Sequence, residues 1–227
     1  MSGEILIGIC GDIGSGKDTV ANHLEKWGFK KIGVANKLKA TLMDVLGIQY
    51  RDFYGTQVEK SAPLAKFGLV PRVLGLFGGP WPERVGRPWL ARWVLEFVGT
   101  ECFRSVYPET WIDHVVGEVM EDRARFHYMR DRSESARKSM GAGHALHVVP
   151  DVRFPNEFTA IRAAGGVIWR TIKTGEGESE RTGHASDEAW RGMEVDADLI
   201  AEPGDLPSLR RQADDLVEAT LRRGERG

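Results

Sequence analysis

The chain has 227 residues, of which 41% are hydrophobic and 28% are charged, and its formal net charge at pH 7 is −2. This length and composition permit one α/β domain with inserts, or a domain with a small lid. The balanced charge excludes a general attraction to nucleic acid, and no apolar run approaches the roughly 20 residues of a membrane span. We therefore expect a cytoplasmic protein without a signal peptide, a membrane partner or a nucleic-acid partner. Its two cysteines, Cys10 and Cys102, are predicted to be buried thiols rather than a disulfide.

The first predicted element is a buried β-strand, indicated by the apolar run from Ile5 to Cys10. Residues 11–19, GDIGSGKDT, follow it and lead into a helix. The apolar face of that helix consists of Val20, Ala21, Leu24 and Trp27. A strand, a glycine-rich turn, a lysine and a helix form the context of a phosphate-binding P-loop. Glycines let backbone N–H groups curl around a phosphate, while the helix N-terminus and Lys17 add positive charge. The pattern predicts a site for ATP with Mg²⁺.

This loop departs from the general P-loop pattern at its end. The usual pattern closes with Gly-Lys-Ser/Thr, whose hydroxyl binds Mg²⁺, whereas Asp18 stands at that place here and Thr19 follows it. A carboxylate repels a triphosphate unless a metal or a base lies between them. We therefore expect Asp18 to face the metal through water and Thr19 to bind an inner phosphate. The alternative is a glycine-rich turn without a ligand, which the flanking strand and helix disfavour.

Beyond the loop, the hydrophobic periodicity alternates between strand and helix patterns. The predicted strands are residues 29–35, 145–149, 167–172 and 198–201. The predicted helices are residues 38–46, 88–103, 111–119, 155–164 and 208–221. Pro155 stands near the start of one helix, and Ser208 is predicted to cap the last one. Strands separated by helices predict an α/β fold with a parallel sheet, and ligands bind such sheets at the carboxyl ends of the strands.

Three stretches interrupt this order. Residues 75–88 are rich in glycine and proline and predict a loop. Residues 121–143 are densely charged, which is compatible with a charged helix extension, a mobile lid or a disordered insert; a solvated charged face is the favoured interpretation. Residues 173–183 are polar, rich in glycine and placed after a predicted strand, which makes them a candidate active-site loop.

A second centre of predicted chemistry is the segment HVVPDVR at residues 147–153. An apolar strand that ends in an acid is typical of the metal-side carboxylate of a P-loop protein, so Asp151 would orient Mg²⁺ or its water. Arg153 would emerge near the same strand end, where a guanidinium can donate two hydrogen bonds to a phosphate. The alternative is a structural Asp–Arg pair at a strand end.

Two further segments carry weaker signals. In GTECFR, at residues 99–104, Arg104 is either a phosphate ligand or an exposed arginine that covers the last helix carbonyls. Glu101 and Thr100 would contact a phosphate acceptor or cap the next turn. In residues 184–188, HASDE, a lone histidine in a polar loop is more often exposed than catalytic, and the serine with its acids resembles a helix start.

Four pieces in this order, GDIGSGKDT, VGTECFR with Trp111, VVPDVRFPNE and GHASDE, resemble the phage-type deoxynucleoside monophosphate kinases, which are P-loop nucleotide kinases. The ending Gly-Lys-Asp-Thr is normal for that group, and DVRFPNE followed by AIRAAGG is the most specific piece. The likeness covers nearly the whole chain and is thin in residues 51–90 and 121–143. If the chain is phage-encoded, the resemblance places it in the cytoplasm of a bacterial host.

The resemblance implies a single P-loop kinase domain, a parallel sheet flanked by helices, with an acceptor-side insert near 51–90 and a possible lid at 121–143. It implies transfer of the ATP γ-phosphate to a deoxynucleoside monophosphate, and a homodimer. ATP and Mg²⁺ would be bound by Gly11, Gly14, Ser15, Gly16, Lys17, Asp18 and Thr19, with Asp18 and Asp151 on the metal side. The acceptor would be bound by Glu101, Arg104, Arg153 and Arg181. Lys17, Arg104, Asp151 and Arg153 would act in the transfer itself.

The resemblance requires no general base, because the acceptor is already an ionised phosphate. Two other functions stay open on the residues alone. One is another small-molecule P-loop kinase, such as a dephospho-coenzyme A kinase or a phosphomevalonate kinase, against which DVRFPNE and GTECFR argue. The other is an ATP-binding switch without transfer activity, which would need fewer arginines on the acceptor side.

Overall fold

The computed structural model describes residues 4–72, 84–130, 132–135, 144–174 and 189–224. The chain forms two compact units. The first comprises Met1–Val34 and Trp111–Gly227, and we call it the sheet unit. The second comprises Ala35–Thr110, and we call it the helical unit.

The sheet unit is built on five parallel strands in the order β2-β3-β1-β4-β5. The strands are β1 (Ile5–Gly11), β2 (Lys30–Lys31), β3 (Leu146–Pro150), β4 (Val167–Lys173) and β5 (Ala197–Ala201). All seven residues of β1 are buried, as expected for a central parallel strand covered on both faces. The prediction of an α/β fold with a parallel sheet is confirmed.

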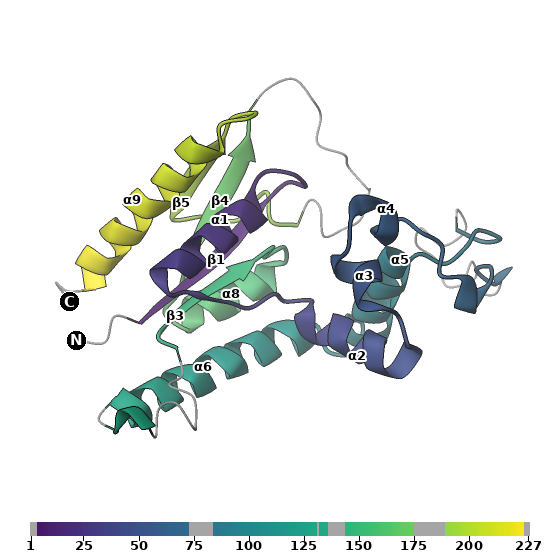
Figure 1. Cartoon of the computed structure of the whole chain (residues 1–227), viewed down its shortest axis with the longest axis horizontal. Helices are drawn as coiled ribbons and strands as arrows, with labels where there is room; N and C mark the ends of the chain where they lie inside the picture. Colours follow the sequence, from purple (N-terminus) through teal and green to yellow (C-terminus); the bar gives the residue numbers. More distant parts are fainter. Residues whose placement is uncertain (1–3, 73–83, 131, 136–143, 175–188, 225–227) are drawn as a thin grey trace. The chain divides into compact units, whose positions relative to one another are not determined.

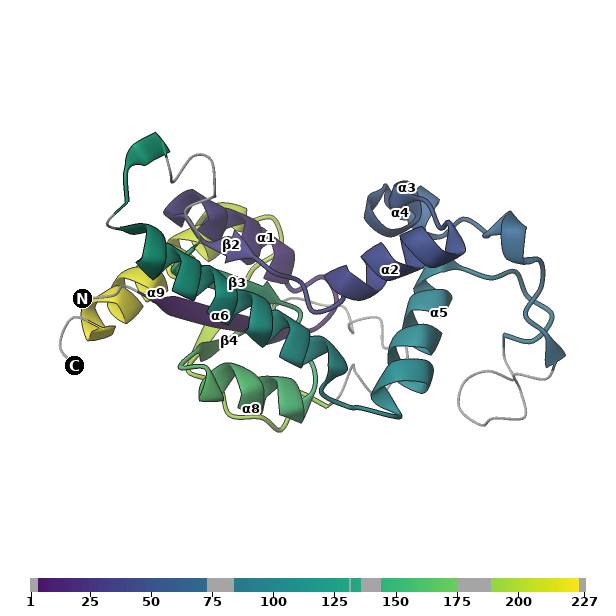
Figure 2. The same ribbon diagram turned by 90° about the horizontal axis from the view of Figure 1, so that it is seen from below.

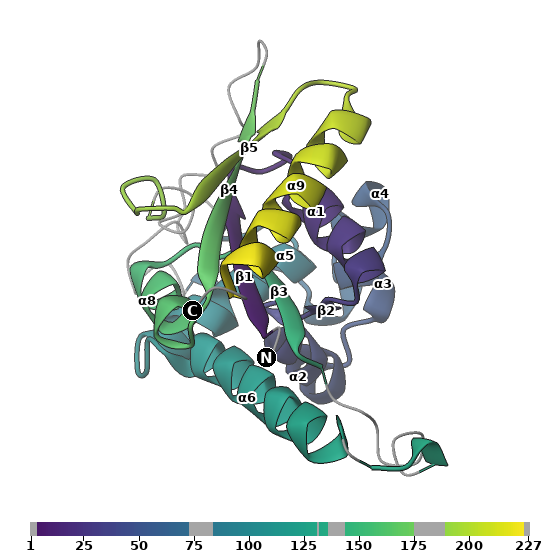
Figure 3. The ribbon, with the colours of Figure 1, turned by 90° about the vertical axis from the view of Figure 1, so that its left-hand side faces the viewer.

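Helices cover both faces of this sheet (Figures 1 and 3). On one face, α1 (Lys17–Leu24) and α9 (Leu206–Gly224) enclose a core that contains Ile7, Ile9 and Trp169. On the other face, α6 (Thr110–Arg130) and α8 (Pro155–Ala163) enclose a second core that contains Leu6, Phe158 and Ile168. The alternating side chains of β1 thus supply both cores, which fixes the register of the strand.

Two predicted elements of the sheet unit differ from the structure. The strand predicted at 29–35 is reduced to β2, because only this short edge segment pairs with β3 before the chain leaves the sheet. The last helix begins at Leu206, and the carboxylate of Asp205 accepts a hydrogen bond from Ser208 N at 2.9 Å. Ser208 is therefore not the cap as predicted, since an acidic side chain three residues earlier satisfies its N–H and also faces the positive helix end.

The helical unit contains short helices seen together in Figure 2. They are α2 (Asn36–Leu46), α3 (Tyr50–Tyr54), α4 (Gln57–Lys60), the 3₁₀ turn η2 (Ala65–Phe67), α5 (Ala91–Glu96) and the π-helical segment η4 (Phe97–Arg104). In the sheet unit, a further 3₁₀ turn, η1 (Glu25–Trp27), follows α1.

The helix predicted at 88–103 is present as α5 and η4 but changes its winding, since Ser105 N donates to Thr100 O, five residues back, at 3.0 Å. π-Helical turns are rare and occur frequently at functional sites.

The structure also tests the predictions for the two cysteines and for the stretches that interrupt the strand–helix order. Both cysteines are free; Cys10 is buried, which raises the pKa of its thiol to about 12, whereas Cys102 is exposed, contrary to the prediction. Cys102 lies on η4 within a run of exposed residues, 101–103, so this side of the helix has no core to face. Residues 121–130 continue α6 as a charged helix. Most of the loop predicted at 75–88 lies outside the described residues. Among the described helices, none combines the length and apolarity that a membrane crossing needs.

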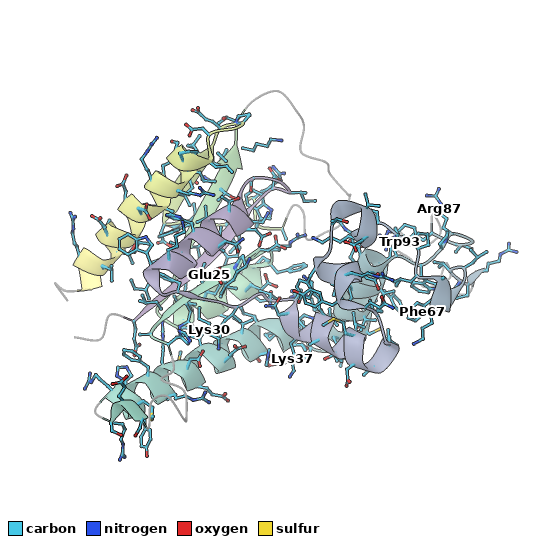
Figure 4. The ribbon with its side chains drawn as sticks, in the orientation of Figure 1. Glu25, Lys30, Lys37, Phe67, Arg87 and Trp93 are labelled. Atoms are coloured by element: carbon cyan, nitrogen blue, oxygen red, sulfur yellow. The ribbon has the colours of Figure 1, made fainter. Side chains whose placement is uncertain are left out.

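An ionic cluster attaches α6 to the edge of the sheet. Lys30 Nζ, labelled in Figure 4, lies 2.6 Å from Asp122 Oδ2 and 2.8 Å from Glu118 Oε1. The buried imidazole of His147 on β3 approaches the same Asp122 oxygen at 3.4 Å. Desolvation opposes ionisation of Asp122, but the hydrogen bond and charge of Lys30 outweigh it and lower the pKa of this carboxyl below its usual value.

We expect Asp122→Asn to lower the free energy of unfolding by about 1–3 kcal/mol at pH 7. A carboxyl whose pKa is lowered by folding stabilises above its unfolded pKa, and this contribution disappears as the pH falls through the folded pKa. The difference between wild type and variant should therefore be constant near neutrality and shrink below about pH 4. Urea denaturation across this pH range measures it. Glu121→Gln, at an exposed α6 position, is the control, and a pH-independent difference for Asp122→Asn would contradict the account.

Gly8 tests the packing of α8 against β1. A Cβ added at Gly8 would lie 2.8 Å from the Cδ1 atoms of both Ile161 and Ile168. We expect Gly8→Ala to destabilise the fold by about 1–3 kcal/mol through overpacking. The same change at Gly117, an exposed α6 position with no atom within 4 Å, should be neutral or stabilise by up to about 1 kcal/mol. Chemical denaturation compares the pair, and equal stabilities would refute the packing argument.

Candidate functional site

The glycine-rich loop predicted at residues 11–19 connects β1 to α1 at the carboxyl end of β1 (Figure 1). Gly11, Gly14 and Gly16 have φ values of 140°, 75° and 95°, a region that side chains disfavour. A Cβ at Gly11 would also lie 2.4 Å from Thr171 O, and one at Gly16 would lie 2.7 Å from Leu209 Cδ2. Close neighbours and backbone geometry together require glycine at these two positions.

The loop leaves backbone donors available. Ser15 N donates to Asp12 O at 3.2 Å, and Gly16 O accepts from Val20 N at 3.0 Å. Within the described part of the chain, the N–H groups of Gly14 and Gly16 have no hydrogen-bond acceptor. Unpaired N–H groups next to a helix N-terminus are suited to an anion.

Lys17 extends back over this loop. Its Nζ donates to Gly11 O at 2.8 Å and to Asp12 O at 2.7 Å, and only 10% of the side chain is exposed. Asp151 Oδ1 lies 3.5 Å from the same ammonium. The positive charge of Lys17 is therefore held at the loop by two carbonyl oxygens and one carboxylate.

Asp151 directly follows β3 and connects two cations. Its Oδ2 lies 2.8 Å from an Arg153 guanidinium nitrogen, while its other oxygen faces Lys17. Desolvation would raise the pKa of this carboxyl, but the charges of Arg153 and Lys17 outweigh it and lower the pKa below the usual value. Asp151 is thus ionised at neutral pH. The Asp–Arg pair, which the sequence left open as the structural alternative, is present, and Lys17 joins it; the roles of Asp151 toward Mg²⁺ and of Arg153 toward phosphate stay predictions.

Asp151 also has an unusual backbone. Its φ is 66°, the only positive value among the described non-glycine residues. Aspartate and asparagine tolerate this left-handed conformation better than most residues do. The turn is followed directly by the start of α8, where Glu157, itself 2% exposed, accepts hydrogen bonds from the N–H groups of Arg153 and Phe154 at 2.7 and 3.1 Å. A buried carboxylate thus fixes the backbone on which Arg153 is carried.

Two contacts of the loop were missed by the sequence analysis. Ser15 Oγ lies 2.6 Å from Thr171 Oγ1 of β4, and both side chains are buried. Asp12 forms an ion pair with Arg191, whose guanidinium also lies 5.1 Å from the centre of the Trp190 ring. A hydroxyl inside an apolar strand is a weak signal for Thr171. Nothing in the sequence around Arg191 distinguishes it from a surface arginine.

The remaining predicted residues are distributed as follows. Asp18 is exposed on α1 and its carboxylate lies 2.8 Å from Lys31 Nζ, so a metal role would require this ion pair to open. Thr19 is half-buried on the same helix. Glu101 and Arg104 belong to η4 of the helical unit. Arg181 and residues 184–188 lie outside the described residues. The predicted roles of all these residues stay predictions.

Comparison with curated proteins finds a relative by sequence. No family model matches the chain. The chain is 27% identical over 173 residues, 75% of its own length and 75% of the relative's, to a protein of Acanthamoeba polyphaga mimivirus named "Putative deoxynucleotide monophosphate kinase".

Two solved structures are similar over most of the chain. One is TT1252 from Thermus thermophilus, with 18% identity, a TM-score of 0.43, and coverage of 95% of this chain and 97% of that one. The other is an unliganded sugar kinase from Janibacter sp. HTCC2649, with 13% identity, a TM-score of 0.33, and coverage of 96% and 92%. At these TM-scores neither likeness establishes a shared fold, so the fold class rests on the parallel sheet itself.

The conformation of Asp151 leads to a prediction about stability. Asp151→Asn and Asp151→Ala both remove the charge between Lys17 and Arg153, so both should destabilise the protein. Asparagine tolerates a positive φ, whereas alanine should cost about 1–2 kcal/mol more in this conformation. Urea denaturation at pH 7 measures the order, which we expect to be wild type, then Asn, then Ala. Equal stability of the two variants would show that the backbone of residue 151 is not constrained.

Proposed function

We propose that this protein is a kinase that transfers the γ-phosphate of ATP to a deoxynucleoside 5′-monophosphate, giving ADP and the diphosphate. The observation that carries the proposal is the ammonium of Lys17, held over a glycine-rich loop 3.5 Å from Asp151. The motifs shared with phage-type monophosphate kinases support the acceptor class. The name of the mimivirus relative agrees with it.

This transfer requires little covalent chemistry from the protein. Phosphoryl transfer needs two anionic phosphates held in line and their charge neutralised. The N–H groups of Gly14 and Gly16, which have no acceptor in the described part of the chain, would bind phosphate oxygens of ATP. Lys17 would exchange its carbonyl acceptors, Gly11 O and Asp12 O, for phosphate oxygens, which is a modest change because the ammonium is already at the loop.

We expect Mg²⁺ to bind at this site through carboxylates. Among the described residues, no group of three or more His, Cys, Asp or Glu side chains could hold a metal ion. Mg²⁺ usually takes one or two carboxylates together with substrate phosphates and water. We assign the ionised Asp151, together with Asp18, to this carboxylate set, and the bound ion would neutralise phosphate charge.

Arginines would complete the neutralisation. Arg153 lies beside Asp151 at the loop, and its planar guanidinium is suited to a transferring or acceptor phosphate. We assign Arg104, Glu101 and Arg181 to the acceptor side on the resemblance. Because an ionised acceptor phosphate is already a nucleophile, this reaction needs no general base.

The experiment is a measurement of ADP release from ATP and Mg²⁺ with each common deoxy- and ribonucleoside monophosphate added separately. Turnover that requires one or a few deoxy acceptors is the expected result, and it would identify the base. Turnover with dephospho-coenzyme A or phosphomevalonate instead would identify another small-molecule kinase. ATP binding without turnover on any acceptor would refute a kinase and favour an ATP-binding switch.

Lys17→Ala should reduce kcat/KM by at least about 10³-fold, or ~4 kcal/mol, if Lys17 stabilises the transition state. An exposed salt bridge contributes only about 1 kcal/mol, so a loss below tenfold would remove Lys17 from the chemistry. Lys26→Ala, which removes an exposed lysine of the same unit, should leave kcat/KM unchanged. Steady-state kinetics with the preferred acceptor compares the two variants.

A further inference from the structure

A buried pair of hydroxyl groups joins the glycine-rich loop to the neighbouring strand. Ser15 stands in the middle of the loop and is fully buried, and Thr171 of β4 is 1% exposed. Their oxygens are 2.6 Å apart although the residues are 156 positions apart in the sequence. Thr171 lies opposite Gly11 in the parallel pairing of β4 with β1, so the register of the sheet creates this contact.

The direction of the hydrogen bonds follows from the number of protons. Thr171 Oγ1 donates to Cys10 O at 3.3 Å, which uses its one proton. Ser15 must then donate to Thr171, giving a chain from the loop through Thr171 to the last residues of β1. An added Cβ at Gly11 would lie 2.6 Å from Thr171 Oγ1 and 2.8 Å from Ser15 Oγ. The start and the middle of the loop therefore converge on one threonine side chain.

Burying hydroxyl groups costs free energy unless they are hydrogen-bonded, so a purely structural need for bulk here would be met as well by valine. The position of Ser15 suggests what the hydroxyl does. Ser15 lies between Gly14 and Gly16, whose N–H groups have no acceptor among the described residues and which have little conformational preference of their own. One buried tether between these glycines restricts the directions of both N–H groups.

We propose that Thr171 is a positioning residue that holds the loop, through the Ser15 hydroxyl, in the conformation that binds the phosphates of ATP. The inference rests on the proposed function, because it assumes that the loop binds ATP. Thr171 itself does not touch the nucleotide. It acts by raising the fraction of the protein in which the loop is ready for a phosphate.

Thr171→Val keeps the shape of the side chain but removes the acceptor, which leaves the Ser15 hydroxyl buried without a partner. The loop then spends time in other conformations, and the apparent Kd for ATP rises by the inverse of the competent fraction. We expect about a tenfold rise in Kd, or 1.4 kcal/mol. KM for ATP should rise with it, while kcat at saturating ATP should change by less than about threefold. Thr171→Ser keeps the hydroxyl and should restore Kd.

The experiment measures ATP binding by calorimetry for wild type, Thr171→Val, Thr171→Ser, Ser15→Ala and the double variant Ser15→Ala with Thr171→Val. Thermal denaturation of each protein sets a working temperature well below every midpoint. Thr220→Val is the matched control, since it also removes a threonine hydroxyl, which donates to Leu216 O at 2.7 Å within α9, away from the loop.

The outcomes separate a positioning role from a structural one. The inference is supported if Thr171→Val raises the Kd for ATP and Thr171→Ser restores it. The double variant should then have a Kd no higher than that of the single variant that binds ATP more weakly. A Thr171→Val protein of lower thermal stability but unchanged Kd would overturn it, as would equal weakening by Thr220→Val. If wild type itself binds no ATP, the proposed function and this inference fail together, whereas an ATP-binding wild type with an unaffected Thr171→Val variant defeats this inference alone.

Discussion

The parallel pairing of β1 with β3 on one side and with β4 on the other decides where the candidate groups of the sheet unit lie. Parallel strands end at the same edge of a sheet, so residues that follow β3 meet the loop that follows β1. Ile9 lies opposite Pro150, which places Asp151 beside Lys17, and Gly11 lies opposite Thr171. Everything proposed for the loop depends on these two registers.

Charge neutralisation is the second organising feature of the site. Lys17 and Arg153 share Asp151, and Arg191 pairs with Asp12. Each of these three cations therefore already has an anionic partner. In the proposed reaction, a polyphosphate would compete with these carboxylates, and a divalent cation bound by Asp151 would release both neighbouring cations for the phosphates. The proposed binding of metal and of phosphate would thus be coupled through one carboxylate.

Most elements were predictable because their signals are local. The buried run of β1, the apolar face of α2 and the proline at the start of α8 each occupy a few consecutive residues. Three predictions that differ from the structure have separate causes. Residues 29–35 have strand character, but pairing with a neighbour decides where an edge strand ends. The sequence offers two capping residues three positions apart, and the cap of α9 is Asp205, whose carboxylate accepts from Ser208 N. The π-helical winding of η4 has no periodic signature that separates it from an α-helix.

The sequence by itself determined the glycine-rich loop, the place of Lys17 and the strand-end position of Asp151 with Arg153, because each is encoded by spacing within fewer than ten residues. Only the tertiary structure decided which side chains complete the loop. Thr171 lies 156 positions from its partner Ser15, and Arg191 lies 179 positions from its partner Asp12. Lys31 of β2 forms an ion pair with the carboxylate of Asp18. Such contacts depend on strand order and register, which are set by the packing of the two cores on the faces of the sheet and not by any local pattern.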